Sequence, residues 1–190
     1  MTIARFAVPL FVTFATPAIA GPFGMDVEGF TPEKYSCSNL SGLFYRCMGV
    51  PKPHNDFEAY AVQYHKDAGL CMIKGIGKDV KENGYGGMVR EKVEEIYSQV
   101  SSKYGKLEKS DFLLPSSIWN EPDDWLMGLV KSERVYAYSG EISPSVDGIA
   151  TYLVAAGATS SDSGYVIVEF YTENKEKCEV ANSKDGASSF

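Results

Sequence analysis

The strongest constraint on the fold is a one-sided apolar stripe in the middle of the chain. Between residues 86 and 104, apolar side chains recur at helical spacing, and charged or polar side chains fill the other side. Gly105 follows, as is common where a helix ends in the left-handed conformation. The pattern predicts a helix over residues 86–104, which must pack against something flat, most simply a sheet. The stripe consists of Val89, Val93, Ile96, Tyr97, Val100 and Tyr104.

Strand-like segments lie on both sides of this helix in the sequence. Residues 57–65 alternate in polarity, a turn follows at 66–69, and residues 70–76 are apolar, which together predict an antiparallel hairpin. Further strands are predicted over residues 135–138, 148–158 and 165–172, the last two joined by a polar turn. Residues 111–117 are interpreted as a loop. Short helices are predicted near residues 32–40 and after the acidic, proline-containing start at Glu121.

This order of elements predicts the class of fold. Strands and helices occupy separate parts of the chain, which is typical of α+β proteins. We expect an α+β domain with an antiparallel sheet of about five strands and two to three helices packed on one face. The domain is expected to span residues 21–179, and the small, polar residues 180–190 are expected to form a disordered tail.

The first twenty residues have the pattern of a secretory signal peptide. Arg5 precedes an apolar run that begins at Phe6, and Ala18-Ile19-Ala20 forms a small-x-small cleavage site. The run is shorter than the roughly 20 residues that cross a bilayer, and no later segment is long and apolar enough to span one. We expect export, cleavage after Ala20 and a location in the periplasm or the medium. Gly21 follows the cleavage site, so no lipid is expected there.

The charge of the chain bears on its partners. Eighteen basic and 25 acidic residues give a formal net charge of −7. An acidic chain of this kind is a poor partner for nucleic acid or anionic lipid. The glycine-rich run from Gly75 to Lys78 lacks the complete phosphate-loop pattern. We therefore predict no cofactor, no nucleic acid and no membrane span, with the oligomeric state left open.

Four cysteines lie in the part of the chain expected to be exported. An even number in an oxidising compartment predicts two disulfides, and four cysteines allow three pairings. We favour one bond from Cys37 to Cys47 and one from Cys71 to Cys178. The competing zinc site is disfavoured because the spacings fit no CxxC pattern and the chain has two histidines.

Candidate chemistry centres on the region around His54. His54, Asp56 and Glu58 lie within five residues, and His65 follows one strand length later. Imidazole and carboxylates together could hold a metal or act as acid and base, although a solvated or capping role also explains them. The carboxylates from Glu121 to Asp124 are explained by the start of a helix. No complete catalytic set emerges, and the sequence favours a non-enzymatic protein.

Aromatic side chains offer a surface instead. The sheet face opposite the helices is expected to expose tyrosines, which supply amphipathic contact area. Two indoles beside the acidic helix start offer a second platform, although core packing is the commoner role of tryptophan. The candidate interaction residues are Tyr60, Tyr64, Trp119, Trp125, Tyr152 and Tyr171, with Tyr165 on the same face.

Several short motifs occur together along the chain. They are Val50-Pro51-Lys52-Pro53-His54, Phe57-Glu58, Gly69-Leu70-Cys71, Ile73-Lys74-Gly75-Ile76-Gly77-Lys78, Tyr85-Gly86, Lys103-Tyr104-Gly105, Ser117-Ile118-Trp119-Asn120-Glu121-Pro122 and Asp124-Trp125. Their combination resembles a family of uncharacterised exported proteins of Gram-negative bacteria, from about residue 50 to residue 175. The start at Gly21-Pro22-Phe23 is similar to the mature start of such proteins. The resemblance implies a periplasmic location and no catalytic residues.

Together these observations favour a small periplasmic protein that binds another protein or an envelope component. A metal-dependent or acid–base hydrolase that uses the His54 region is the alternative. A structural role in envelope stress is a third.

Overall fold

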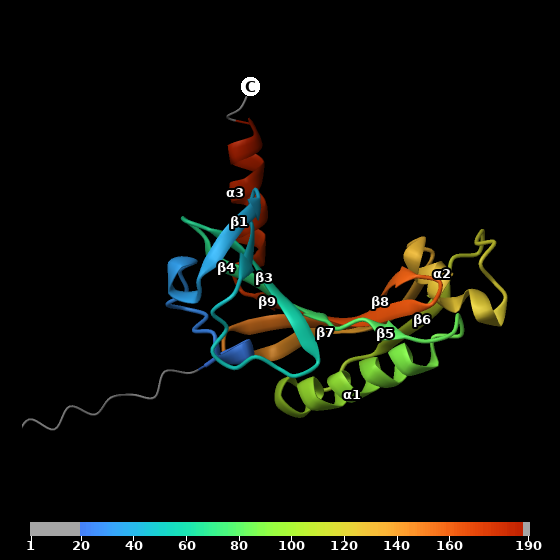
Figure 1. Cartoon of the computed structure of the whole chain (residues 1–190). Coiled ribbons are helices and arrows are strands. Elements are labelled where there is room, and N and C mark those ends of the chain that lie inside the picture. The colour runs from blue at the N-terminus through green and yellow to red at the C-terminus, as the bar shows by residue number, and fades with distance from the viewer. Residues whose placement is uncertain (1–19, 188–190) are drawn as a thin grey trace, which may run out of the picture.

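The computed structural model describes residues 20–187, and its main feature is one large antiparallel sheet (Figure 1). The predicted signal peptide, apart from Ala20, lies outside the described residues. The strands are β1 (Cys37–Ser41), β2 (Phe44–Cys47), β3 (Phe57–His65), β4 (Gly69–Gly77), β5 (Val80–Lys81), β6 (Lys109–Leu113), β7 (Arg134–Val146), β8 (Ile149–Ser160) and β9 (Ser163–Thr172). The helices are α1 (Gly87–Tyr104), α2 (Trp125–Val130) and α3 (Lys175–Ala187), with 3-10 turns at Pro22–Gly24, Glu33–Tyr35 and Pro122–Asp124.

The strand order joins the two halves of the chain at one place. The order is β1-β2-β3-β4-β9-β8-β7-β6, and β5 pairs with the start of β9. All pairs are antiparallel. The N-terminal strands β1–β4 meet the C-terminal strands β6–β9 through the β4–β9 pair. Each half contains local hairpins, whereas the β4–β9 contact links residues almost one hundred positions apart.

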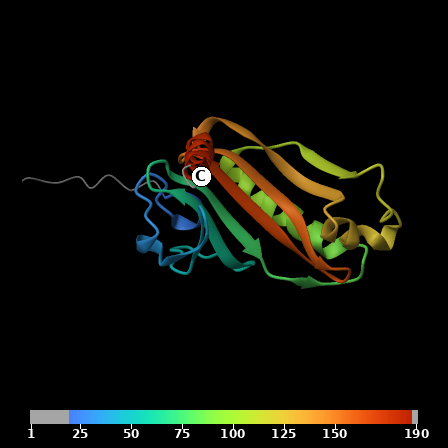
Figure 2. The ribbon, with the colours of Figure 1, turned by 90° about the horizontal axis from the view of Figure 1, so that it is seen from above.

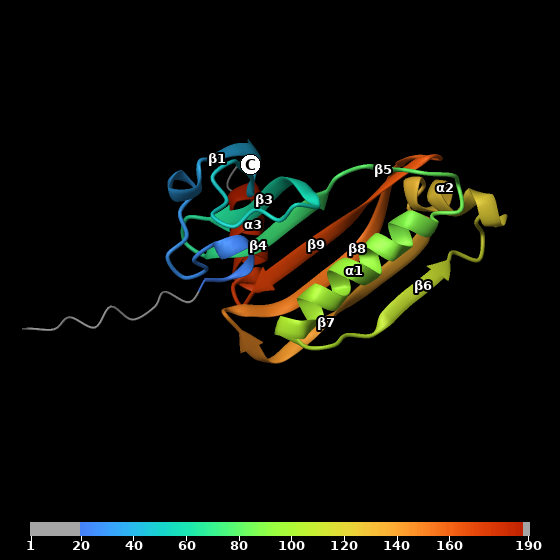
Figure 3. The same cartoon turned by 60° about the horizontal axis from the view of Figure 1, so that its bottom comes forward.

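Helix α1 covers one face of the sheet, as the apolar stripe predicts. Val89, Val93, Ile96 and Tyr104 are buried, and α1 contacts β7, β8 and β9. From Gly164 on, strand β9 alternates between buried and half-buried residues, because successive residues of a strand point to opposite faces. Figure 3 shows this side, with α1 lying across the sheet. The predicted helix is confirmed.

The segment after residue 20 covers the same face over β3 and β4. Met25 is fully buried, and the ring of Phe23 lies 4.8 Å from that of Tyr60 and 5.5 Å from that of Phe57. Gly75 leaves the room for these rings, since a Cβ there would lie 2.9 Å from both phenylalanines. The start of the described chain is therefore part of the core.

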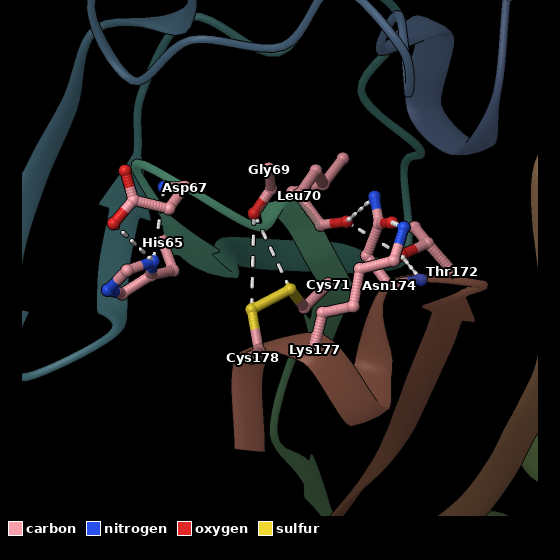
Figure 4. Close-up of a disulfide and its surroundings, with 9 residues drawn as sticks. All are labelled: His65, Asp67, Gly69, Leu70, Cys71, Thr172, Asn174, Lys177 and Cys178. Carbon is pink, nitrogen blue, oxygen red and sulfur yellow. Dashed lines mark hydrogen bonds and ion pairs between the residues drawn. A yellow bond between two sulfur atoms is a disulfide. The ribbon is translucent and has the colours of Figure 1, made fainter. Parts of the chain in front are cut away.

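Helix α3 stands on the other side of the sheet from α1 (Figure 1). It contacts β3 and β4, and Cys178 is the one buried side chain among its described residues. The Cys71–Cys178 disulfide joins it to β4 (Figure 4). Beside the disulfide, the carbonyl oxygen of Leu70 accepts hydrogen bonds from Thr172 Oγ1 at 2.6 Å and Asn174 Nδ2 at 3.4 Å. Helix α3 includes residues 180–187, which are most of the segment 180–190 that was predicted to be a disordered tail.

The predicted α+β fold with about five strands is wrong. The described chain has nine strands and three short α-helices, so the sheet dominates. Strands β1 and β2 show little alternation of polar and apolar residues and lie in a turn-rich segment, so the sequence pattern did not predict them. A short helix was expected there, near residues 32–40. Strand β6 occupies part of the predicted loop, because it pairs with β7 despite its polar sequence. Strand β7 extends far beyond residue 138. The helices also lie on both sides of the sheet.

Candidate functional site

The face of the sheet away from α1 is open across its middle strands. Figure 2 looks onto this face, with α1 behind the sheet and α3 seen end-on. Helix α2 also lies behind the sheet, since Leu126 and Val89 both approach Gly164. The open face carries the half-buried residues of β9, in contrast to the buried residues that face α1.

An uncharged row of small and aliphatic side chains crosses this face. The strand registers align one residue from each of six strands, β6, β7, β8, β9, β4 and β3. At about 4.8 Å between strands, the row is about 24 Å long. We call it the apolar row. It consists of Ser110, Ala137, Ala155, Ile167, Ile76 and Ala59, of which Ala137 is buried and the other five are half-buried.

Larger aromatic side chains border the apolar row on the side away from α3. Tyr165 lies across Gly157, since a Cβ on Gly157 would come within 2.7–3.0 Å of its ring and hydroxyl. Phe112 pairs with Val135 at the edge of the sheet and is 48% exposed. The side chains of the apolar row are therefore smaller than the neighbouring rings of Tyr165 and Phe112, which border the row on this side.

A polar cluster borders the apolar row on the side toward α3. Lys74 Nζ lies 2.9 Å from Glu169 Oε1, and the hydroxyl of Tyr171 donates to Glu169 Oε2. Burial, and then the neighbouring carboxylate, raise the pKa of Tyr171, so that the phenol stays protonated. Lys175 Nζ lies 4.8 Å from the centre of the Tyr171 ring. Each oxygen of the Glu169 carboxylate therefore has one partner within this cluster.

Acidic side chains surround the base of α3 on the same side of the sheet. A hollow of about 520 Å³ lies between α3 and the ends of β7, β8 and β9. A second hollow, of about 420 Å³, lies between α3 and the β1–β2 hairpin. Both include Lys175 and Glu179. The first is also lined by Glu141, Glu173 and Glu176, so it has a negative charge next to the polar cluster.

The predicted aromatic surface is only partly exposed. Tyr171 and Tyr165 lie on the open face, but Tyr60, Tyr152 and Trp125 are 7%, 0% and 6% exposed and belong to the core. They lie on the α1 side, since the alternation of a strand does not tell which face the helices will cover. Tyr64 is half-buried against Phe30 and Tyr45, and Trp119 is half-buried in the loop before α2, near Lys131.

The sequence pattern missed most of the open face. Ala155, Ile167 and Ile76 were not singled out, because small and aliphatic residues in strands are usually core residues. The alternation of β8 and β9 was visible in the sequence and could have found them. Which of the two faces is open depends on where α1 packs.

His54 is occupied by contacts within the chain. Its Nδ1 accepts the backbone N–H of Asp56 at 3.2 Å, and its Nε2 lies 3.0 Å from Gln99 Oε1. This pattern places the proton on Nε2 and leaves neither ring nitrogen free. The carboxylate of Asp56 is paired with Lys92 at 3.2 Å.

His65 lies at the far end of β3 from His54. The nine residues of β3 span about 30 Å, so the two imidazoles do not meet. Among residues 20–187, no group of three or more His, Cys, Asp or Glu side chains is placed to hold a metal ion. Near His54 the structure brings together one imidazole and one carboxylate, with His54 Nδ1 3.7 Å from Asp56 Oδ2.

The cysteines form two disulfides, Cys37–Cys47 and Cys71–Cys178. These are the two pairings favoured from the sequence. No cysteine is left as a free thiol. Two disulfides are consistent with a periplasmic or extracellular protein.

Similarity to known proteins adds no assignment. No protein-family model matches the chain, and comparison with the curated proteins and with the solved structures found no match. In the part of the chain that the structure describes, no helix is both long and apolar enough to cross a bilayer.

Proposed function

We propose that this chain is an exported binding protein that is cleaved after Ala20 and docks another envelope protein on its open sheet face. The apolar row carries the proposal. It is an uncharged stripe about 24 Å long, bordered by the rings of Tyr165 and Phe112. Large uncovered apolar patches of folded chains are characteristic of interaction sites.

The charge beside the apolar row indicates the chemistry of the partner. The hollow at the base of α3 is lined by Glu141, Glu173, Glu176 and Glu179, against one lysine, Lys175. Complementary charge steers association and selects partners. The expected partner is a protein segment with an apolar face about as long as the row and with Lys or Arg at the end that meets α3.

A binding role agrees with the chemistry of the open face. Lys74, Glu169 and Tyr171 satisfy one another, and such a set supplies recognition and orientation more readily than proton transfer. The two disulfides fit the oxidising compartment in which an envelope partner is met.

Photocrosslinking in intact cells tests the proposal. A photoreactive amino acid replaces Ile167 in the apolar row, or Met88, which is 55% exposed on α1 behind the sheet. We expect a discrete crosslinked protein from position 167 and none from position 88. Mass spectrometry of the purified protein checks at the same time whether the mature chain begins at Gly21.

A substitution separates specific docking from chance contact. Ala155→Arg places a positive charge in the apolar row and should repel a basic partner, so the crosslink from position 167 should fall at least about tenfold. Met88→Arg is the matched control and should leave the crosslink unchanged. Equal crosslinking from positions 167 and 88, or an Ala155→Arg variant that melts like the parent and crosslinks as well, would contradict the proposal.

A further inference from the structure

A separate hollow lies on the α1 side of the sheet, where the N-terminal segment meets the end of α1. Its volume is about 350 Å³, near the lower end of the roughly 300–1,000 Å³ of small-molecule sites. Four parts of the chain build it, one of which is β9 with Phe170. The N-terminal segment contributes Phe23, the connection before β3 contributes Lys52 and His54, and α1 contributes Lys103 and Tyr104.

Tyr104 is the unusual residue in the lining of this hollow. Its side chain is 4% exposed, and its buried hydroxyl makes no hydrogen bond of normal geometry among the described residues, although the neighbouring Lys103 ammonium interacts with it. A buried polar group without a good hydrogen bond destabilises the fold, and such a group calls for a water, an ion or a ligand. The nearby Tyr152 differs, since its hydroxyl donates to the carbonyl oxygen of Gly105. Burial raises the pKa of Tyr104, so its hydroxyl remains a donor at neutral pH.

The charge of this hollow is opposite to that of the whole chain. Lys52 and Lys103 both line it, although the formal net charge of the protein is −7. Lys103 Nζ also pairs with Asp147 Oδ2 at 2.6 Å, and it lies 5.0 Å from the centre of the Tyr104 ring. Two ammonium groups and a protonated phenol are all hydrogen-bond donors, and together they favour an anion.

The rest of the lining is apolar. Phe23, Val100 and Phe170 contribute to the walls, and the Phe23 and Phe170 rings lie 6.0 Å apart. Apolar walls with a few convergent polar groups are typical of sites for small organic molecules. A bare inorganic anion would leave these walls without a partner.

We propose that this hollow binds a small carboxylate with an apolar body. The carboxylate accepts hydrogen bonds from Lys52, Lys103 and the hydroxyl of Tyr104, and the apolar body contacts Phe23 and Phe170. This site is distinct from the open face and does not depend on a protein partner there.

The proposed cleavage after Ala20 would strengthen the same site. Gly21 also lines the hollow, and its backbone nitrogen donates to the carbonyl oxygen of Met25 at 2.8 Å. Cleavage would turn this nitrogen into an ammonium group with two further donors and a positive charge. The site does not require this ammonium group, because Lys52, Lys103 and Tyr104 already provide hydrogen-bond donors.

Titration with phenylacetate, followed by amide chemical shifts and by calorimetry, tests the site. We expect saturable binding with shifts at Phe23, Lys103 and Tyr104. Phenylacetamide has nearly the same shape without the charge and should bind at least about tenfold more weakly. The tripeptide Gly-Gly-Phe offers the same carboxylate at a chain end. If phenylacetate binds more tightly than Gly-Gly-Phe, the site prefers a free acid. The reverse order of affinities indicates a peptide terminus.

Three substitutions separate binding from folding. Lys52→Met should weaken phenylacetate binding about tenfold. Tyr104→Phe should weaken binding about fivefold but should not lower the melting temperature of the free protein, because the buried hydroxyl makes no hydrogen bond of normal geometry there. Tyr152→Phe is the matched control and should lower the melting temperature while leaving the affinity unchanged. Absence of saturable binding, equal affinity for acid and amide, or wild-type affinity in both Lys52→Met and Tyr104→Phe would overturn the proposal.

Discussion

At the scale of single residues, one carboxylate fastens α1 to the edge of the sheet. Glu94 Oε1 accepts hydrogen bonds from Lys109 Nζ at 2.7 Å and from the Tyr136 hydroxyl at 2.6 Å, and Glu94 Oε2 accepts one from the Tyr138 hydroxyl at 2.7 Å. The ring of Tyr138 also stacks on that of Tyr97, with centroids 3.6 Å apart. The polar side of the amphipathic helix therefore takes part in packing as well as its apolar stripe.

Removing this carboxylate should loosen α1. Glu94→Ala leaves three donors without their acceptor, but the Glu94 side chain is 42% exposed, so water replaces part of the loss. We expect the free energy of unfolding to fall by about 1 kcal/mol in denaturant titrations. Glu95→Ala is the control, because Glu95 pairs with Lys92 on the exposed side of the same helix. Equal losses in the two variants would show that the contacts of Glu94 add nothing.

At the scale of elements, α3 depends on a covalent bond more than on packing. Cys178 is the one buried side chain among its described residues, and Val180 is 54% exposed. Isolated helices of this length are marginal in water. The Cys71–Cys178 disulfide, with a sequence separation of 107, is therefore the main attachment of α3 to β4.

Breaking this bond should release α3 while the sheet persists. In a Cys71→Ser, Cys178→Ser double variant, hydrogen exchange should accelerate throughout α3 and stay slow in β8 and β9. The loop-entropy model gives an upper figure of about 5 kcal/mol for the loss in stability. A Cys37→Ser, Cys47→Ser variant is the control and should affect the β1–β2 hairpin alone. Unchanged exchange in α3 of the first variant would show that noncovalent contacts hold it.

The same scale shows how much of the fold was predictable. Helix α1 and the hairpins β3–β4 and β8–β9 follow from periodicity that is visible within a short window of sequence. Strands β1, β2 and β6 lack that signal and form because a neighbouring strand offers hydrogen-bond partners. The apolar row was not predictable as a unit, since its residues come from six strands and are aligned only by pairing.

At the scale of the whole molecule, buried phenols set an upper pH limit for stability. Burial raises the pKa of Tyr138 and Tyr152 to about 12, and the Glu94 carboxylate adds to the shift at Tyr138. A phenol whose pKa is higher in the folded chain stabilises the fold below its ordinary value near 10. That stabilisation is lost as the pH rises from 10 through the folded value.

Stability should therefore fall steeply between about pH 10 and 12. Thermal melting midpoints should drop over this interval, and the ultraviolet signal of tyrosinate should rise together with unfolding. Tyr138→Phe removes one raised pKa and should make the decline shallower, whereas Phe in place of the exposed Tyr85 should not change it. A tyrosinate signal that is complete well before unfolding would contradict the burial of these phenols.

The sequence alone determined the local elements of this protein. The helix over residues 87–104, the alternation of the long strands and the preference for two disulfides depend on residues close together in the chain or on their number. Tertiary structure decided the rest. The count of nine strands, the face that α1 leaves open and the meeting of Lys52, Lys103 and Tyr104 depend on contacts between distant segments. The physical reason is that periodicity gives a strand two equivalent faces, and only packing decides which one is buried.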